Sequence, residues 1–216
     1  MRTLIILLYL VATPLWAHPH IFVNTGVEVI MDAQNRLTHL RITWEYDELY
    51  SLLVTEDLEV DDDYDEVLTA ADLAKLQGFD MKWIEGFNGD LVVTLNKETL
   101  ALSPPLEPTA TMANGKITTT HLRAVLAAPE VAATDVVVIN PFDATYYTAY
   151  DVTLPVTVTG REGCKLTRKL PDIDDALRRT QAELAELPPD VETDEVGFAG
   201  IGERFATQIV LTCAAP

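Results

Sequence analysis

Basic residues, aromatic residues and long apolar runs are all scarce in this chain. Only 15 of the 216 residues are Lys or Arg, against 34 Asp or Glu, so the formal net charge is −19, and aromatic residues make up 7%. An acidic surface of this strength repels a phosphate backbone, which argues against nucleic acid as a partner. The apolar run at residues 4–12 is shorter than the roughly 20 residues that span a bilayer core, which argues against a membrane anchor there.

The first 17 residues have the pattern of a secretory signal peptide. Met1 and Arg2 supply a positive end, residues 4–12 form a short apolar core, and Ala17 is a small residue that a signal peptidase accepts. We therefore expect a signal peptide at 1–17 and a mature chain at 18–216 that works in the periplasm without a membrane span. Because Arg2 leaves with the signal, the net charge of −19 becomes −20. The mature length suits a single β-rich domain.

The chain has two cysteines, Cys164 and Cys213, both in segments with the pattern of strands. In an oxidising compartment they could form a disulfide, which we expect to join the last strand to an earlier one. A thiolate metal site is the alternative, but two isolated cysteines without C-x-x-C spacing support it weakly.

Apolar periodicity predicts an α+β fold made mainly of antiparallel strands in a sandwich-like arrangement. Alternation from Ile21 to Met31 and from Leu40 to Tyr46 indicates a β-hairpin. Helical spacing then indicates a helix-loop-helix insertion within about 47–88, with the leucines 49, 52 and 53 in its first helix. We expect strands near 90–95, 99–103, 109–127, 134–140 and 145–159, one helix at 171–187, and a last strand at 205–213.

The loop between the two predicted helices resembles a degenerate EF-hand loop and is a candidate calcium site. Three aspartates fall at positions one, three and five of a twelve-residue loop, with a threonine at nine and an aspartate at twelve. Glu66 stands where a glycine usually makes the sharp turn, and the last aspartate is shorter than the usual glutamate, so we expect weak binding. The alternative is a solvated acidic loop without an ion. The candidate ligands are Asp61, Asp63, Asp65, Thr69 and Asp72.

The predicted mature N-terminus, His18-Pro19-His20, is a candidate site for zinc, nickel or copper. Cleavage after Ala17 would leave the free amine of His18 beside its own imidazole, and His20 projects to the same side of an extended chain. Pro19 has no N–H to deprotonate, which favours a chelate of amine and imidazoles over one through backbone nitrogens. The plainer alternative is that both histidines merely begin an edge strand. We expect His39 and His121 to be ordinary surface residues.

Three motifs and the acidic loop together resemble a known family. The motifs are HPHIFV at 18–23, TWEYDELY at 43–50 and NPFDATYY at 140–147. The combination is similar to bacterial periplasmic domain-of-unknown-function family 1007, described as the periplasmic component of an uncharacterised ABC-type transport system. The resemblance covers nearly the whole mature chain and implies a companion of nickel, cobalt or zinc permeases of the inner membrane. Asp47, Glu48, Asp143 and Tyr146 belong to these motifs, where they could bind metal or could cap a helix and hold a turn.

Three classes of function therefore remain open. The leading expectation is a non-enzymatic, periplasmic metal-binding accessory that captures a divalent transition metal and passes it to an inner-membrane permease of the nickel/cobalt type. The second is an interaction or structural module whose histidines are incidental. The third is a copper-dependent oxidative enzyme that uses an N-terminal histidine chelate, although neither G-x-S-x-G nor H-E-x-x-H occurs in the chain.

Overall fold

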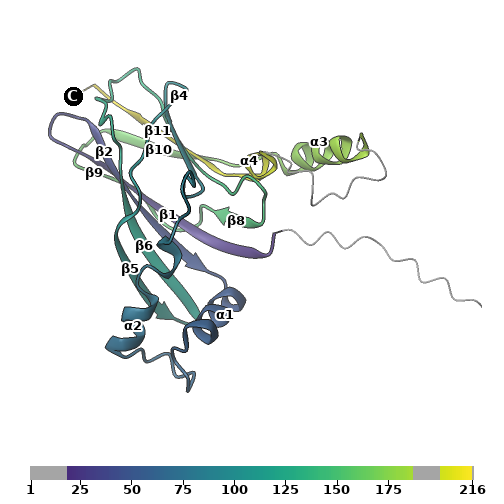
Figure 1. The fold of residues 1–216 in the computed structure, drawn as a ribbon. Helices are drawn as coiled ribbons and strands as arrows, with labels where there is room; N and C mark the ends of the chain where they lie inside the picture. Colours follow the sequence, from purple (N-terminus) through teal and green to yellow (C-terminus); the bar gives the residue numbers. More distant parts are fainter. Residues whose placement is uncertain (1–18, 187–199, 216) are drawn as a thin grey trace, which may run out of the picture.

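The computed structural model describes residues 19–186 and 200–215, so the predicted signal peptide and His18 lie outside the described residues. The described part contains two mostly antiparallel β-sheets and a few helices (Figure 1). The predicted α+β class is thereby confirmed. None of the helices in these two stretches is long and apolar enough to cross a membrane.

The first sheet is built around the predicted hairpin, and a long strand, β1, forms part of its centre. Two short strands, β8 and β9, both pair in parallel with the same edge of β1, one after the other, whereas the remaining pairs are antiparallel. The hairpin of β1 and β2 is confirmed. In spatial order the strands are β5 (Leu106–Ala113), β6 (Lys116–Ala124), β2 (Leu37–Tyr46), β1 (Ile21–Met31), then β8 (Thr148–Asp151) and β9 (Val156–Thr159).

The second sheet is entirely antiparallel and brings the C-terminal strand into its interior. That strand, β11, lies between β10 and β7, so residues far apart in sequence meet here. In spatial order the strands are β10 (Cys164–Lys169), β11 (Gln208–Cys213), β7 (Val137–Pro141), β3 (Leu91–Leu95) and β4 (Glu98–Thr99).

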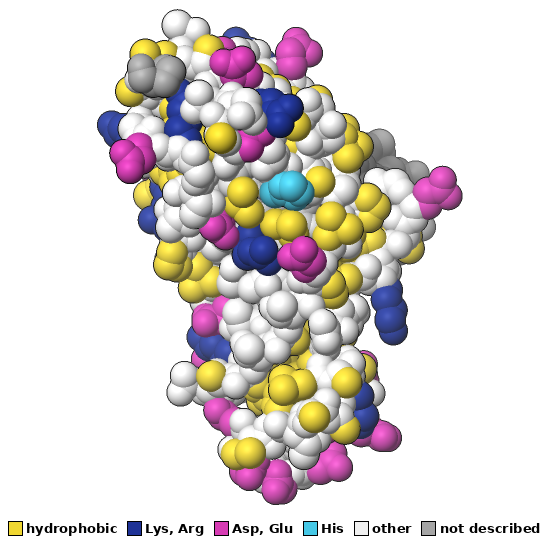
Figure 2. All heavy atoms as spheres, turned by 90° about the vertical axis from the view of Figure 1, so that its left-hand side faces the viewer, with side chains coloured by type: hydrophobic (Ala, Val, Ile, Leu, Met, Phe, Trp, Pro, Cys, Tyr) yellow, Lys and Arg dark blue, Asp and Glu magenta, His cyan; other side chains and the backbone are white. Residues whose placement is uncertain are grey.

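The helices occur in two places along the chain. Between β2 and β3, where the helical insertion is predicted, lie α1 (Glu48–Leu58), α2 (Ala70–Leu76) and the short 3-10 helix η1 (Phe79–Met81). Between β10 and β11 lie α3 (Ile173–Ala185), close to the predicted bounds, and the short α4 (Ile201–Phe205). Figure 1 places α1 and α2 at the opposite end of the molecule from the C-terminus, and Figure 2 shows acidic side chains gathered at the α1 and α2 end.

The core lies between the inward faces of the two sheets. Val27 faces Ile42 and Val29 faces Leu40 across the β1–β2 pair, so alternate residues of both strands point to one side. These four side chains are at most 2% exposed, and they belong to one apolar cluster with residues of β3, β7 and β11. The period-two pattern therefore identifies the buried face of the hairpin correctly.

Two long strands predicted from the sequence are each divided in two. The segment 109–127 is a hairpin of β5 and β6, because Asn114 and Gly115 both take positive φ, 52° and 72°, as a two-residue hairpin turn requires. The segment 145–159 is divided into β8 and β9, with Pro155 before the second. Proline supplies no N–H to a ladder, so a strand through it is interrupted.

Candidate metal centres

The start of β1 is the point at which the three motif segments meet. The backbone N–H of His20 donates to the carbonyl oxygen of Tyr147 at 2.8 Å, and the centroids of their two rings lie 4.7 Å apart. The next residue, Ile21, pairs with Thr148 in the parallel β1–β8 ladder. His20 is exposed. The predicted partner of His20 in a chelate, His18, lies outside the described residues.

Asp47 joins the second motif to the first by acting as a helix cap. Its Oδ1 accepts from the backbone N–H of Tyr50 at 2.9 Å, which is the N-cap bond of α1. Its Oδ2 accepts from the N–H of Phe22 at 2.8 Å, and its own N–H donates to the Phe22 carbonyl oxygen at 3.0 Å. The neighbouring Glu48 forms a salt bridge with Lys116 at 3.2 Å. Asp47 and Glu48 thus both have structural partners.

Asp143 holds the turn of the third motif. Its Oδ1 accepts from the N–H and the hydroxyl of Thr145, both at 2.8 Å, and its Oδ2 accepts from the N–H of Thr148 at 3.0 Å. Tyr146 has a φ of 60° and stacks on Phe205 of α4 with 4.6 Å between ring centroids. The motif residues other than histidine therefore shape the surroundings of His20, and the hydrogen bonds favour the capping and turn role for them.

Three of the predicted calcium ligands do come together in the loop between α1 and α2. One carboxylate oxygen from each of Asp61, Asp63 and Asp65 lies within 4.8 Å of the others. Asp61 is only 8% exposed, and its Oδ1 accepts from the N–H of Glu66 at 3.0 Å. Hard divalent cations such as Ca²⁺ prefer oxygen ligands of this kind, so the donor set fits such an ion.

The other two predicted calcium ligands, Thr69 and Asp72, form the capping box at the start of α2. Thr69 caps α2, and the Oδ2 of Asp72 accepts from the Thr69 N–H at 2.9 Å and hydroxyl at 2.7 Å, which lowers the pKa of Asp72. Asp72 is not part of the carboxylate group. Glu66 takes a φ of 61°, so it makes the left-handed turn without a glycine, and its Oε2 accepts from the Asn114 N–H at 2.7 Å.

A layer of buried and partly buried polar side chains was not predicted from the sequence. Asp80, from η1, accepts through its Oδ2 from the hydroxyls of Tyr46 at 2.8 Å and Thr119 at 2.7 Å, and burial raises the pKa of this carboxyl group. Asp90 accepts from the hydroxyl of Tyr150 at 2.8 Å, and burial raises its pKa to about 6. Neither aspartate forms a salt bridge with a basic side chain among the described residues.

His121 belongs to this layer, so its assignment to the surface was wrong. It is 1% exposed and packs against the rings of Trp44 and Trp83, at 4.6 and 5.6 Å between centroids. Neither ring nitrogen has a hydrogen-bond partner among the described residues, and burial lowers the pKa of the imidazole to about 3. Arg123, two residues on, adds a cation above the ring of Trp83, at 4.7 Å from its centroid.

The sequence pattern alone does not show that His121 is buried. Thr119, His121 and Arg123 are alternate, buried residues of β6, and His121 faces the buried Ile42 across the β2–β6 pair. Apart from Ile117, the side chains on this face of β6 are polar, and Leu122 on the other face is buried too, so alternation of apolar residues does not identify the inward face. Only the pairing with β2 shows which set of side chains points inward.

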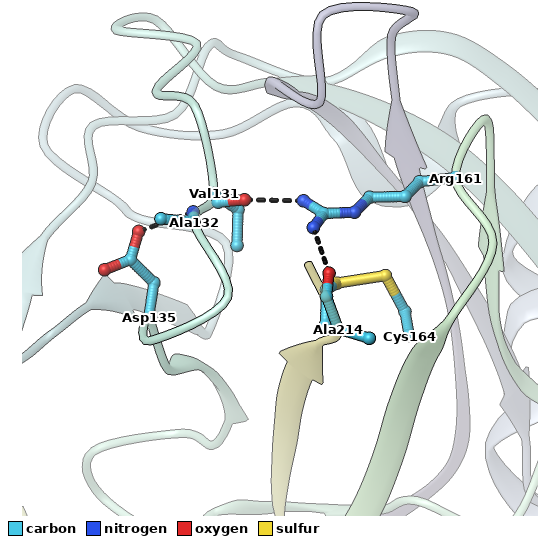
Figure 3. Close-up of a disulfide and its surroundings, with 7 residues drawn as sticks. Val131, Ala132, Asp135, Arg161, Cys164 and Ala214 are labelled. Carbon is cyan, nitrogen blue, oxygen red and sulfur yellow. Dashed lines mark hydrogen bonds between the residues drawn. A yellow bond between two sulfur atoms is a disulfide. The ribbon is translucent and has the colours of Figure 1, made fainter. Parts of the chain in front are cut away.

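The predicted disulfide between Cys164 and Cys213 is present, and it joins directly opposed residues of β10 and β11. Arg161 lies beside it and donates to two backbone carbonyl oxygens, those of Val131 and Ala214 (Figure 3). The bridge and the arginine together fasten the end of the last strand. A disulfide is compatible with a protein exported to the periplasm or beyond.

Comparison with known proteins identifies one family. The family model described as "Protein of unknown function (DUF1007)" matches residues 3–213, which is nearly the whole chain. No curated protein matches the sequence.

Proposed function

We propose that this chain, which belongs to the DUF1007 family of proteins of unknown function, binds a divalent transition metal in the periplasm and exchanges it with an inner-membrane metal permease. It acts as a binding accessory and carries out no chemical reaction. The metal is zinc, nickel, cobalt or copper, held by nitrogen ligands at the mature N-terminus.

The observation that carries this proposal is the position of His20. Its exposed ring stands at the start of β1, and the hydrogen bonds of Asp47 and Asp143 hold the two segments on either side of it. Because both neighbouring segments are held in place, the His20 ring moves less than a metal ligand on a flexible chain terminus would. Cleavage after Ala17 would place the amine and imidazole of His18 two residues away, within reach of the same ion.

The carboxylates of Asp61, Asp63 and Asp65 support a second, separate ion in the α1–α2 loop. Oxygen ligands suit Ca²⁺, Mg²⁺ or Mn²⁺, whereas imidazole and amine suit zinc, nickel and copper. Asp72 takes part in the capping of α2 and does not belong to the carboxylate group, so the loop offers fewer protein ligands than a full EF-hand loop. We therefore propose weak binding in this loop.

Isothermal titration of the processed protein tests the nitrogen site. The N-terminus is first confirmed by mass spectrometry, and zinc, nickel and copper are added in turn. We expect one-to-one, submicromolar binding that disappears when one extra residue precedes His18 or when His18→Ala and His20→Ala are combined. His39→Ala, on β2, is the matched control and should bind like the parent. Heat-silent titrations with all three metals, or unchanged binding by the double variant, would refute this site.

A pair of neighbouring aspartates tests the loop site. Asp62 and Asp63 are both exposed and carry the same charge, but only Asp63 belongs to the carboxylate group. The melting temperature of the parent should rise with added Ca²⁺, that of Asp63→Asn should rise much less, and that of Asp62→Asn should follow the parent. Equal responses of the two variants would show a non-specific effect of charge.

A further inference from the structure

Helix α1 carries apolar side chains on the face that is turned to the solvent. Leu49, Leu52 and Leu53 are 66%, 45% and 57% exposed. Their spacing, i, i+3 and i+4, places them side by side on one face of the helix. A surface helix normally carries polar residues on that face, so three neighbouring exposed leucines need an explanation.

The opposite face of α1 already accounts for the packing of the helix. Ser51, Val54 and Thr55 are buried, and the hydroxyl of Ser51 accepts from the backbone N–H of Ile117 in β6 at 2.9 Å. The helix is therefore attached to the first sheet without Leu49, Leu52 and Leu53. They contribute little to the fold of the described chain, and their exposure to water is unfavourable.

The exposed surface continues beyond the helix onto the acidic loop. Glu56 follows Leu52 and Leu53 by one turn, and its carboxylate accepts from the hydroxyl of Tyr64, which is 65% exposed. Tyr64 is thereby held against the same side of α1. We call the surface formed by Leu49, Leu52, Leu53 and Tyr64 the α1 face.

The charge around the α1 face is strongly negative. Residues 47–88 contain many aspartates and glutamates but only two basic residues, Lys75 and Lys82, and Lys75 donates to the carbonyl oxygen of Glu59 at 2.6 Å. A second copy of the chain or an anionic membrane would be repelled, whereas a basic partner would be attracted.

We infer that the α1 face docks a basic amphipathic helix of a partner protein. Leucines of the partner would cover the leucines of α1, and its lysines or arginines would meet the surrounding carboxylates, as in other helix-recognition surfaces. The docking does not depend on metal binding. Asp47, which caps α1, also accepts from Phe22, so a docked helix would lie next to the segment that carries His20.

A pair of synthetic peptides tests this inference on the purified, processed protein in the presence of EDTA. One is an amphipathic helix of about 18 residues, five turns, with leucines on one face and lysines on the other. The second keeps the lysines and replaces the leucines with serine, so it reports charge attraction alone. Fluorescence anisotropy of the labelled peptides gives the affinities. We expect the first peptide to bind at least about tenfold more tightly, since burial of several leucines adds to the charge attraction.

Matched variants locate the binding surface. Leu52→Gln with Leu53→Gln should weaken binding of the leucine–lysine peptide by about tenfold or more, because the apolar contact is lost while the charge is kept. Ile84→Gln with Leu170→Gln removes two apolar side chains elsewhere that are even more exposed, and this variant should bind like the parent. Circular dichroism checks that both variants fold. No binding of the first peptide, equal affinity for both peptides, or equal loss in both variants would overturn the inference.

Discussion

Replacing the buried histidine of β6 should change how the stability of the protein depends on pH. His121 is 1% exposed, lies between Trp44 and Trp83, and has no hydrogen-bond partner for either ring nitrogen among the described residues. Leucine is apolar and of similar volume. The substitution His121→Leu therefore removes a titrating group from the core while filling most of the same space.

The sign and size of the effect follow from the two protonation equilibria. The pKa of His121 falls from 6.5 to about 3 on folding, because burial disfavours the imidazolium ion. Between these values the unfolded chain binds a proton that the folded chain does not, so the parent loses stability as the pH falls below 6.5. At pH 5 the loss amounts to about 2 kcal/mol relative to pH 8, at 1.36 kcal/mol per unit. The His121→Leu variant has no imidazole at this position, so this fall in stability does not occur in it.

Urea unfolding at pH 8 and pH 5, followed by tryptophan fluorescence, measures the difference. The free energy of unfolding of His121→Leu, relative to the parent, should rise by about 2 kcal/mol between the two pH values. Ile42→Val is the matched control, because Ile42 faces His121 across the sheet and carries no proton; it should cost about 1 kcal/mol at both pH values. The reasoning would be refuted if the free energy of unfolding of His121→Leu differed from that of the parent by the same amount at pH 8 and at pH 5.

Three further predictions concern other parts of the fold. Combining Cys164→Ser with Cys213→Ser should lower the free energy of unfolding in guanidinium by about 4 kcal/mol, since the bridge spans 49 residues. Gly202→Ala should lower the melting temperature, because a Cβ there would lie 1.8 Å from the Asp143 carbonyl oxygen. Asp90→Asn should raise the free energy of unfolding at pH 8 by about 3 kcal/mol. Burial raises the pKa of Asp90 from 3.8 to about 6, so the folded state loses stability as the pH rises through that value, and the gain should largely vanish at pH 4.

Local patterns in the sequence were sufficient for the elements of the fold but not for their pairing. The alternation in β1 and β2 and the helical spacing in α1 depend only on neighbouring residues, and each identifies its element correctly. The attachment of β8 and β9 to one edge of β1, and the position of β11 inside the second sheet, depend on contacts between distant segments. No periodicity encodes those contacts, so the strand order had to come from the structure.

The same distinction separates the predicted from the missed parts of the candidate sites. The spacing of Asp61, Asp63 and Asp65 places their carboxylates together because a short loop keeps near neighbours close. Asp72, at the end of the same loop, takes part in the capping box of α2 instead. Its Oδ2 accepts two hydrogen bonds from Thr69, and Asp72 does not belong to the carboxylate group. The pairs Tyr46–Asp80 and Tyr150–Asp90 join residues 34 and 60 positions apart, which no local motif reveals.

The acidic residues near the start of β1 have a structural role that requires no metal ion. Asp47 uses both carboxylate oxygens, one on Tyr50 and one on Phe22, and Asp143 uses both on Thr145 and Thr148. Asp47 joins two distant segments in this way, whereas Asp143 holds the turn that leads into β8. Such bonds fix the position of a backbone more strictly than an apolar contact, because they are directional. Replacement of either aspartate should therefore loosen the strand start beneath His20, and its effect on metal affinity would be indirect, through the mounting of the histidine.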